Sequence, residues 1–243
     1  MQQQLERSKD LIQAGRFAAA EALLLDVLGG ELDAGPASEA RYMLAVSRRY
    51  QKNLSGALQT LDELLGVDRH NGRAYQERGY TLLAMNRPDD AAGAFARAVR
   101  LNPGLLSSWR MLVGLHRRAG RDEEAARAGR EAARLEALPR ELRAVIDLLH
   151  DGRLRRAETL CRHYLRANPR DVEAMRLLAD IAVRLHVYDD AEFLLESCVE
   201  LDPDHAAARC DYVAILNRKG KFARALEQAG ILLDKEPGRT AHR

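Results

Sequence analysis

The sequence has little of what builds β-sheets, disulfide frameworks or membrane spans. Only 5% of its 243 residues are aromatic, and clusters of β-branched residues are almost absent, which favours an all-α fold. The three cysteines, Cys161, Cys198 and Cys210, lack metal-ligand spacing, and their odd number favours reduced thiols in a cytoplasmic protein. No run of about 18 apolar residues is present, which argues against a membrane span. The first ten residues lack the apolar segment of a signal peptide.

Charge and motifs exclude further classes of protein. The formal net charge is only +2, which is too balanced to indicate a nucleic-acid partner. The sequence contains no phosphate-binding loop, dinucleotide fingerprint, zinc-hydrolase motif or nucleophile elbow, so we expect no enzyme, cofactor or metal site. Cys161 and His163 lie two residues apart on a predicted helix and point in different directions. Cys161 and Cys198 are expected in the core, with a thiol pair or metal site as the alternative.

What the sequence does contain is one pattern repeated along its length. Residues 72–105 read as two short amphipathic helices joined by a tight turn. Ala91, Phe95 and Ala98 recur at the spacing of a buried helical stripe, and Gly79 lies where the two helices would touch. A pair of this size cannot bury its apolar side alone, so copies are expected.

The copies are found by their alanines and prolines. The gaps between successive equivalent alanines are 37, 34, 34, 32, 34 and 34 residues, at Ala20, Ala57, Ala91, Ala125, Ala157, Ala191 and Ala225. The prolines that close the units, Pro169, Pro203 and Pro237, are also 34 residues apart. Two landmarks with one period indicate a repeat array, in which each unit packs on its neighbours.

The repeated pattern resembles the tetratricopeptide repeat, whose family pattern is W-x2-L-G-x2-Y, then A-x3-F, then P. The residues that carry the resemblance are Tyr75, Gly79, Ala91, Phe95, Ala98 and Pro103, and then Trp109, Leu112, Ala125 and Ala132. It implies an all-α, right-handed superhelical solenoid of about seven helix–turn–helix units. These units are 1–34, 38–71, 72–105, 106–137, 138–171, 172–205 and 206–239, with a short tail after them. The array is continuous, and the 32-residue step near 135–142 marks a seam between 1–137 and 138–243.

Local signals refine this arrangement. Residues 29–38, with their glycines and Pro36, predict a longer loop after the first repeat. Gly129 replaces the phenylalanine of the pattern, which predicts a fourth helix pair that is weaker or packs more closely. Leu148 is expected in the buried stripe of the fifth unit. The turn inside each unit needs one left-handed residue, and these are Gly15, Lys52, Asn86, Gly120, Gly152, His186 and Gly220.

Two segments carry a more specific resemblance. Residues 148–185 and 189–213 are similar to the N-terminal repeat region of bacterial tetratricopeptide-repeat sulfotransferases, and 37–46 and 86–113 fit the same comparison. This resemblance implies a catalytic domain after Arg243 and no catalytic residue in this chain.

The first helices of such an array line a concave groove. The residues at the groove positions are Glu39, Tyr42, Arg49, Tyr50, Arg73, Gln76, Tyr80, Arg110, Arg117, Arg118, Leu142, Ile146, His150, Glu173, Arg176, Asp180, Arg184, Asn217 and Arg218. Tyrosine and arginine often anchor interfaces. The candidate peptide-binding residues are therefore Tyr42, Arg49, Tyr50, Gln76, Tyr80, Arg110, Arg117, Arg176, Asp180 and Arg184. Arginine suits an acidic partner, although these arginines could simply solvate the inner face.

A chaperone-binding carboxylate clamp is not expected. That clamp uses two lysines, two asparagines and an arginine, whereas Lys9 is followed here by Tyr42, Val46, Gln76 and Tyr80.

We therefore predict a scaffold that binds a protein or peptide segment. The alternatives are the non-catalytic arm of a larger sulfotransferase and a self-associating array. Because no polar-faced helix follows the seventh unit, the sequence is expected to be cut from a longer protein or to pair there with another chain.

Overall fold

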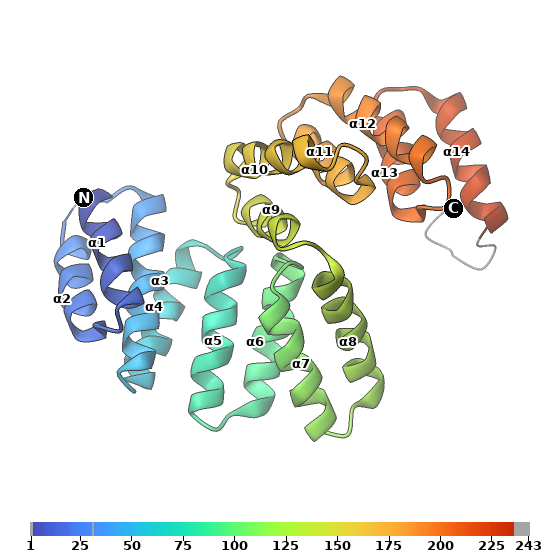
Figure 1. The fold of residues 1–243 in the computed structure, drawn as a ribbon. Coiled ribbons are helices and arrows are strands. Elements are labelled where there is room, and N and C mark those ends of the chain that lie inside the picture. Colours follow the sequence, from blue (N-terminus) through green and yellow to red (C-terminus); the bar gives the residue numbers. More distant parts are fainter. Residues whose placement is uncertain (1, 31, 236–243) are drawn as a thin grey trace. The chain divides into compact units, whose positions relative to one another are not determined.

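The computed structural model describes residues 2–30 and 32–235, and over these ranges it contains fourteen helices and no strand (Figure 1). The predicted all-α fold is confirmed. The chain divides into two compact units, Met1–Ala137 and Leu138–Arg243. Unit 1 contains α1 (Gln2–Gln13), α2 (Phe17–Leu28), α3 (Ala34–Tyr50), α4 (Leu54–Val67), α5 (Gly72–Ala84), α6 (Pro88–Leu101), α7 (Leu106–Arg118) and α8 (Asp122–Ala137). Unit 2 contains α9 (Arg140–His150), α10 (Leu154–Ala167), α11 (Val172–Arg184), α12 (Tyr188–Leu201), α13 (Ala206–Arg218) and α14 (Phe222–Lys235).

A three-residue turn joins the two helices of every pair. All seven predicted turn positions have a positive φ, from 57° at Asn86 to 73° at Gly152. In the third pair the N–H of Arg87 donates to the Leu82 carbonyl and the N–H of Asn86 to the Leu83 carbonyl. These two bonds satisfy carbonyls that the end of the first helix leaves unpaired. The same turn therefore recurs in every pair because it satisfies the unpaired carbonyls at the end of each first helix.

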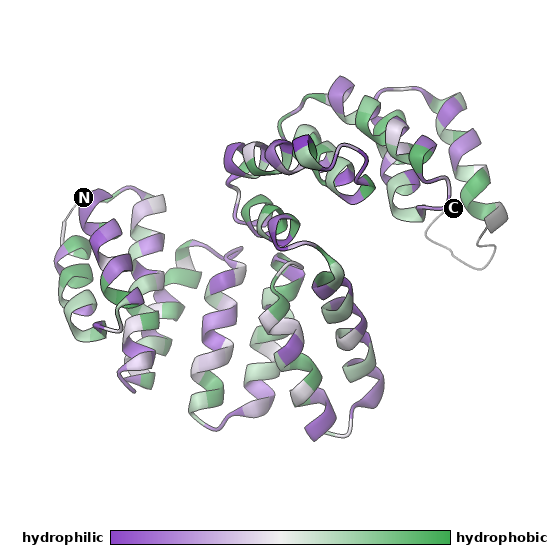
Figure 2. Cartoon of the chain, in the orientation of Figure 1, coloured by the Kyte–Doolittle hydropathy of each residue, from purple (hydrophilic) through white to green (hydrophobic). Residues whose placement is uncertain are grey.

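The repeated alanines form the contact points of the pairs. All seven are buried, and none is more than 4% exposed: Ala20, Ala57, Ala91, Ala125, Ala157, Ala191 and Ala225. A methyl side chain lets two helices approach closely while still removing apolar surface from water. The helices carry both hydrophilic and hydrophobic residues, as amphipathic helices do (Figure 2). Consecutive helices within each unit pack on one another, which is the arrangement of a helical solenoid.

Two sequence expectations need correction. The connection after the first repeat, between Leu28 and Ala34, is longer than the other connections between helix pairs, as predicted, but it ends earlier than expected because Pro36 lies inside α3. Proline is tolerated in a first helical turn, where its missing N–H leaves no bond unmade. In the fifth unit Leu148 is only partly buried, and Leu149, at 2% exposure, takes the core position instead.

The buried cysteines lie in the core as expected. Cys161 and Cys198 are each 0% exposed, and their thiols donate to the backbone carbonyls of Ala174 and Val172 at 3.2 and 3.5 Å. Burial raises the pKa of each thiol to about 12. Both thiols are therefore protonated at neutral pH.

Candidate functional site

The candidate groove residues of unit 1 lie on α3, α5 and α7, the first helices of their pairs. Arg49, near the end of α3, is the centre of this group. Its guanidinium donates to the carboxylate of Glu77 on α5, whose residue is only 4% exposed. Burial by itself lowers the pKa of Arg49, but the hydrogen bond and charge of Glu77 leave it raised. This pair ties two first helices together, because a buried carboxylate needs a cationic partner.

Aromatic rings surround the Arg49 guanidinium. It lies 4.3 Å from the ring centroid of Tyr50 and 5.5 Å from that of Tyr80, within the range of cation–π attraction. The Tyr50 ring also stacks on Phe17, with centroids 4.5 Å apart and planes 3° from parallel. Tyr50 is nonetheless 53% exposed, so part of a pre-oriented aromatic side chain is open to a partner. We call Phe17, Arg49, Tyr50, Glu77 and Tyr80 the tyrosine–arginine cluster.

Two other predicted residues of unit 1 have structural contacts. Gln76 donates from Nε2 to the hydroxyl of Ser108 on α7 at 2.8 Å, which links the next pair of first helices. Tyr42 is partly buried and packs against the apolar clusters of the first two repeats. Both residues help to hold the first helices in register.

Arg110 and Arg117 do not join the tyrosine–arginine cluster. Arg110 pairs with Glu136 on α8 at 2.8 Å, and its side chain is 59% exposed. Arg117 is exposed and makes no side-chain hydrogen bond or ion pair with another described residue. These two arginines are the ones in the predicted set with charge that a ligand could reach easily.

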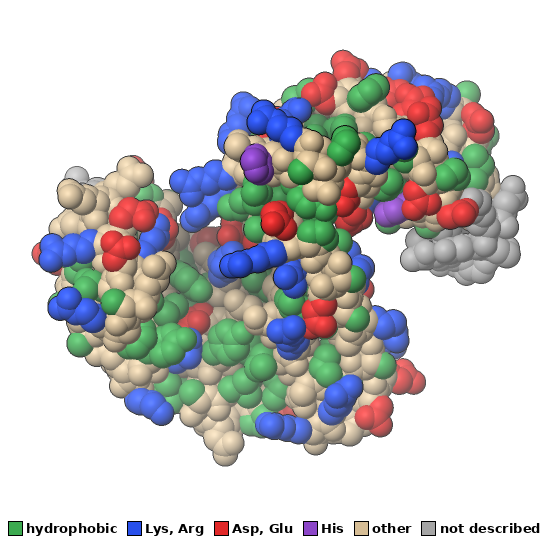
Figure 3. All heavy atoms as spheres, in the orientation of Figure 1, with side chains coloured by type: hydrophobic (Ala, Val, Ile, Leu, Met, Phe, Trp, Pro, Cys, Tyr) green, Lys and Arg blue, Asp and Glu red, His purple; other side chains and the backbone are tan. Residues whose placement is uncertain are grey.

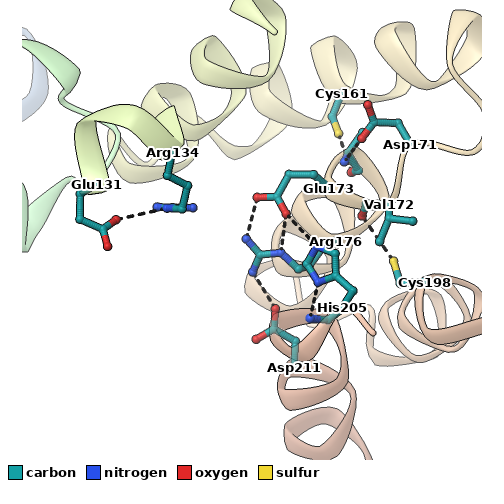
Figure 4. Close-up of polar contacts among 12 residues, drawn as sticks. Glu131, Arg134, Cys161, Asp171, Val172, Glu173, Arg176, Cys198, His205 and Asp211 are labelled. Atoms are coloured by element: carbon teal, nitrogen blue, oxygen red, sulfur yellow. Dashed lines mark hydrogen bonds and ion pairs between the residues drawn. The ribbon is translucent and has the colours of Figure 1, made fainter. Parts of the chain in front are cut away.

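In unit 2 the charge of the predicted groove residue Arg176 is already neutralised by carboxylates of the same unit. Arg176 on α11 donates to Glu173 at 2.8 Å and to Asp211 on α13 at 2.9 Å, while His205 Nε2 lies 3.6 Å from Glu173 (Figure 4). The hydrogen bond that Arg176 donates to Glu173 raises the pKa of Arg176; burial opposes this rise, and the charge of Glu173 adds to it. An incoming carboxylate would have to displace two internal ones. This network therefore joins α11 to α13, much as Arg49 and Glu77 join α3 to α5.

The remaining predicted positions of unit 2 divide into a surface pair and two core residues. Arg184 and Asp180 form an ion pair within α11, with 3.2 Å between Nε and Oδ1. Leu142 and Ile146, placed in the groove by the repeat register, are 0% and 7% exposed. That assignment was wrong, because apolar side chains at these positions pack into the unit instead of facing water.

Two members of the cluster, Glu77 and Phe17, are not among the residues predicted from the sequence. Glu77 stands where the copies on either side have Met43 and Met111, so a carboxylate at an apolar position was a usable signal. Phe17 gave no such signal, since its contact with Tyr50 spans two repeats.

The described residues show no sign of a metal site or a membrane span. Among them no group of three or more His, Cys, Asp or Glu side chains could hold a metal ion. Within the same ranges, every helix is too short or too polar to cross a bilayer.

Comparison with known proteins identifies the repeat. The family model for the tetratricopeptide repeat matches residues 5–74, 77–139 and 142–206. A search of curated proteins returns no match. One similar structure is a tetratricopeptide repeat protein from Parabacteroides merdae, with 16% identity, a TM-score of 0.50, and coverage of 99% of this chain and 95% of that one. Another is YrrB, described as a repeat protein with an unusual peptide-binding site, with 16% identity, a TM-score of 0.38, and coverage of 75% and 95%. At 16% identity the Parabacteroides merdae structure supports the fold alone.

Proposed function

Because the chain belongs to the tetratricopeptide repeat family, we propose that it is a protein–protein interaction scaffold that binds a polypeptide segment across α3, α5 and α7. The observation that carries this proposal is the exposed Tyr50 ring, which contacts both Phe17 and the Arg49 guanidinium. A ring oriented by such contacts loses little conformational freedom when a partner packs on it, so its contact area contributes to affinity.

The charge of the cluster indicates how it would bind. Since Glu77 neutralises Arg49, the cluster favours a flat or apolar side chain over a carboxylate. A preference for an acidic segment would come from Arg110 and Arg117, whose side chains are exposed. We therefore expect the contribution of Tyr50 to affinity to be insensitive to salt, and the contribution of these arginines to fall as salt rises.

A site-specific crosslinker tests this proposal. A photoreactive phenylalanine analogue replaces Tyr50, and in a matched control it replaces Val67 on α4, which is 71% exposed. Proteins captured at position 50 but not at 67 are the candidate partners. Their crosslinked segment, made as a peptide, should bind Tyr50→Ala at least about tenfold more weakly than the original chain. Equal capture at both positions, or unchanged affinity of Tyr50→Ala, would contradict the proposal.

Self-association is a second candidate function, favoured by α14. Phe222 and Leu226, four residues apart on that helix, are 68% and 76% exposed. Light scattering over a range of concentrations tests it: Leu226→Glu should convert any dimer to a monomer, and a chain that is monomeric at every concentration excludes it.

The sulfotransferase resemblance and the cytoplasmic location remain predictions from the sequence. None of the matches described above is a sulfotransferase. A reading frame after Arg243 that encodes a βαβ unit with a phosphate loop would support the recruiting-arm role, whereas a stop codon there would exclude it.

A further inference from the structure

Charge is unevenly distributed along unit 2. Residues 138–171 contain eight arginines and five acidic residues, whereas residues 172–205 contain two arginines and nine acidic residues. The small net charge of the whole chain conceals this contrast between neighbouring repeats. Figure 3 shows Lys and Arg side chains gathered over the part of unit 2 where Figure 1 places α10.

The basic residues of α10 share one face. At about 100° per residue, the side chains of this face cover roughly 120° of the helix, opposite Ala157 and Cys161, and extend about 17 Å along the axis. All are exposed, and they are Arg155, Arg156, Thr159, Arg162, His163 and Arg166. Arg170, just beyond the helix, is exposed as well. We call these residues the α10 arginine face.

Much of this charge is not used within the molecule. Arg162 donates to Glu158 at 3.0 Å, and Arg155 lies 3.7 Å from the same carboxylate. Arg156, Arg166 and Arg170 make no side-chain hydrogen bond or ion pair with any described residue. Arg176 and Arg49, in contrast, are each paired with a carboxylate. Only two of the five arginines therefore have carboxylate partners, Glu158 for both and Asp190 for Arg162 as well, and the face carries a net positive charge.

We propose that the α10 arginine face docks a short acidic segment of a protein partner. The guanidinium fork matches carboxylates in a bidentate geometry. The surroundings argue against a longer polyanion, because α12 presents the exposed acids Asp190 and Glu200 and Asp190 lies only 4.0 Å from Arg162. A nucleic acid or anionic bilayer extending past α10 would meet this negative charge. A segment confined to α10 avoids it.

The face also lacks the side chains that the alternatives use. Single-stranded nucleic acids bind by stacking on exposed aromatic rings, and peripheral membrane helices insert apolar residues. The aromatic residue of α10 is Tyr164, which is only partly exposed and donates its hydroxyl to Asp171 at 2.9 Å. The face itself consists of arginines, one histidine and one threonine.

Charge reversal with a matched control tests the proposal. The probe is a rhodamine-labelled peptide of about twelve Asp and Glu residues, long enough to span the face as a helix, and binding is followed by fluorescence anisotropy. The test variant is Arg156→Glu/Arg166→Glu/Arg170→Glu. The control makes the same charge change in unit 1, at exposed residues with no side-chain partner in the described chain: Arg69→Glu/Arg100→Glu/Arg130→Glu.

The expected result is specific to the test variant. The peptide should bind the original chain and the control alike, bind the test variant at least about tenfold more weakly, and dissociate as salt rises from about 50 to about 300 mM. Replacing the groove arginines, in Arg110→Ala/Arg117→Ala, should leave binding of this probe unchanged, which separates the proposal from the acidic preference of the groove. Equal losses in both triple variants would overturn it. Tighter arginine-dependent binding of a single-stranded oligonucleotide or phosphatidylserine vesicles, or arginine-dependent self-association, would also overturn it.

Discussion

The ring of Phe95 lies directly against the backbone of Gly79, so that a Cβ built on Gly79 would be 2.7 Å from two of the ring carbons. Phe95 is 0% exposed, and its ring meets Tyr80 edge-on with centroids 5.2 Å apart. In a close-packed interior the ring has little room to move aside. The close contact of α5 and α6 therefore depends on glycine at position 79, as the sequence predicts.

Replacing Gly79 should weaken the protein even though alanine favours helix. We expect Gly79→Ala to lower the free energy of unfolding by about 1–3 kcal/mol, because the new methyl group forces the Phe95 ring or the helices apart. Urea denaturation followed by circular dichroism measures the change. An unchanged or higher midpoint would show that the ring yields easily.

Replacing Gly129 on α8 by alanine should have the opposite effect on stability from replacing Gly79. Nothing lies within 4 Å of a Cβ built there, so the alternative that this helix pair packs more closely is wrong. Gly129→Ala should raise the free energy of unfolding by about 0.5–1 kcal/mol, because alanine loses less backbone entropy in a helix. The same urea titration measures it, and a loss of stability would mean that the backbone at this position is strained.

Glu192 on α12 should govern part of the acid stability. Its carboxylate, 8% exposed as a side chain, accepts from Lys219 and from Lys221 at 2.6 Å, with Arg224 at 3.6 Å. Hydrogen bonds from Lys219 and then Lys221 hold the pKa of Glu192 below its usual value. The folded state therefore gains stability above the unfolded pKa and loses it as pH falls through the folded one.

Glu192→Gln tests that linkage. The variant should be less stable at neutral pH and should lose less stability than the original chain between about pH 5 and about pH 3. Unfolding free energies measured by urea titration across this range provide the comparison. Two parallel curves would show that Glu192 does not couple folding to protonation.

The thiols of Cys161 and Cys198 should not react with a disulfide reagent in the folded protein. Because burial raises the pKa of Cys161 and Cys198 to about 12, neither forms the thiolate that reacts with a disulfide reagent at about pH 8. The double variant Cys161→Ala/Cys198→Ala should therefore match the original chain in native labelling and differ from it only in urea. Reduced native labelling of the double variant would show that these sites open readily.

The repeat could be predicted from sequence because its determinants are local. Gly15 and Asn86 mark turns that depend on a few neighbouring residues, and Ala91 marks a contact made in the same way in every copy. The pairings across repeats could not be predicted. Arg49 pairs with Glu77 on the next first helix, and this pairing depends on burial and rotamers that no spacing rule contains. Arg176 fits a groove position in sequence, yet two internal carboxylates surround it.

Within each unit a helix packs mainly on the helices next to it and next but one along the chain. Stabilisation that a bound partner gives to α3 and α5 should therefore fade over a few helices instead of stiffening the whole unit. Deuterium uptake would then act as a local footprint, in which the slowed amides mark the place of contact. Partners on the tyrosine–arginine cluster and on the α10 arginine face would slow different sets of amides, and both could be mapped in a single sample.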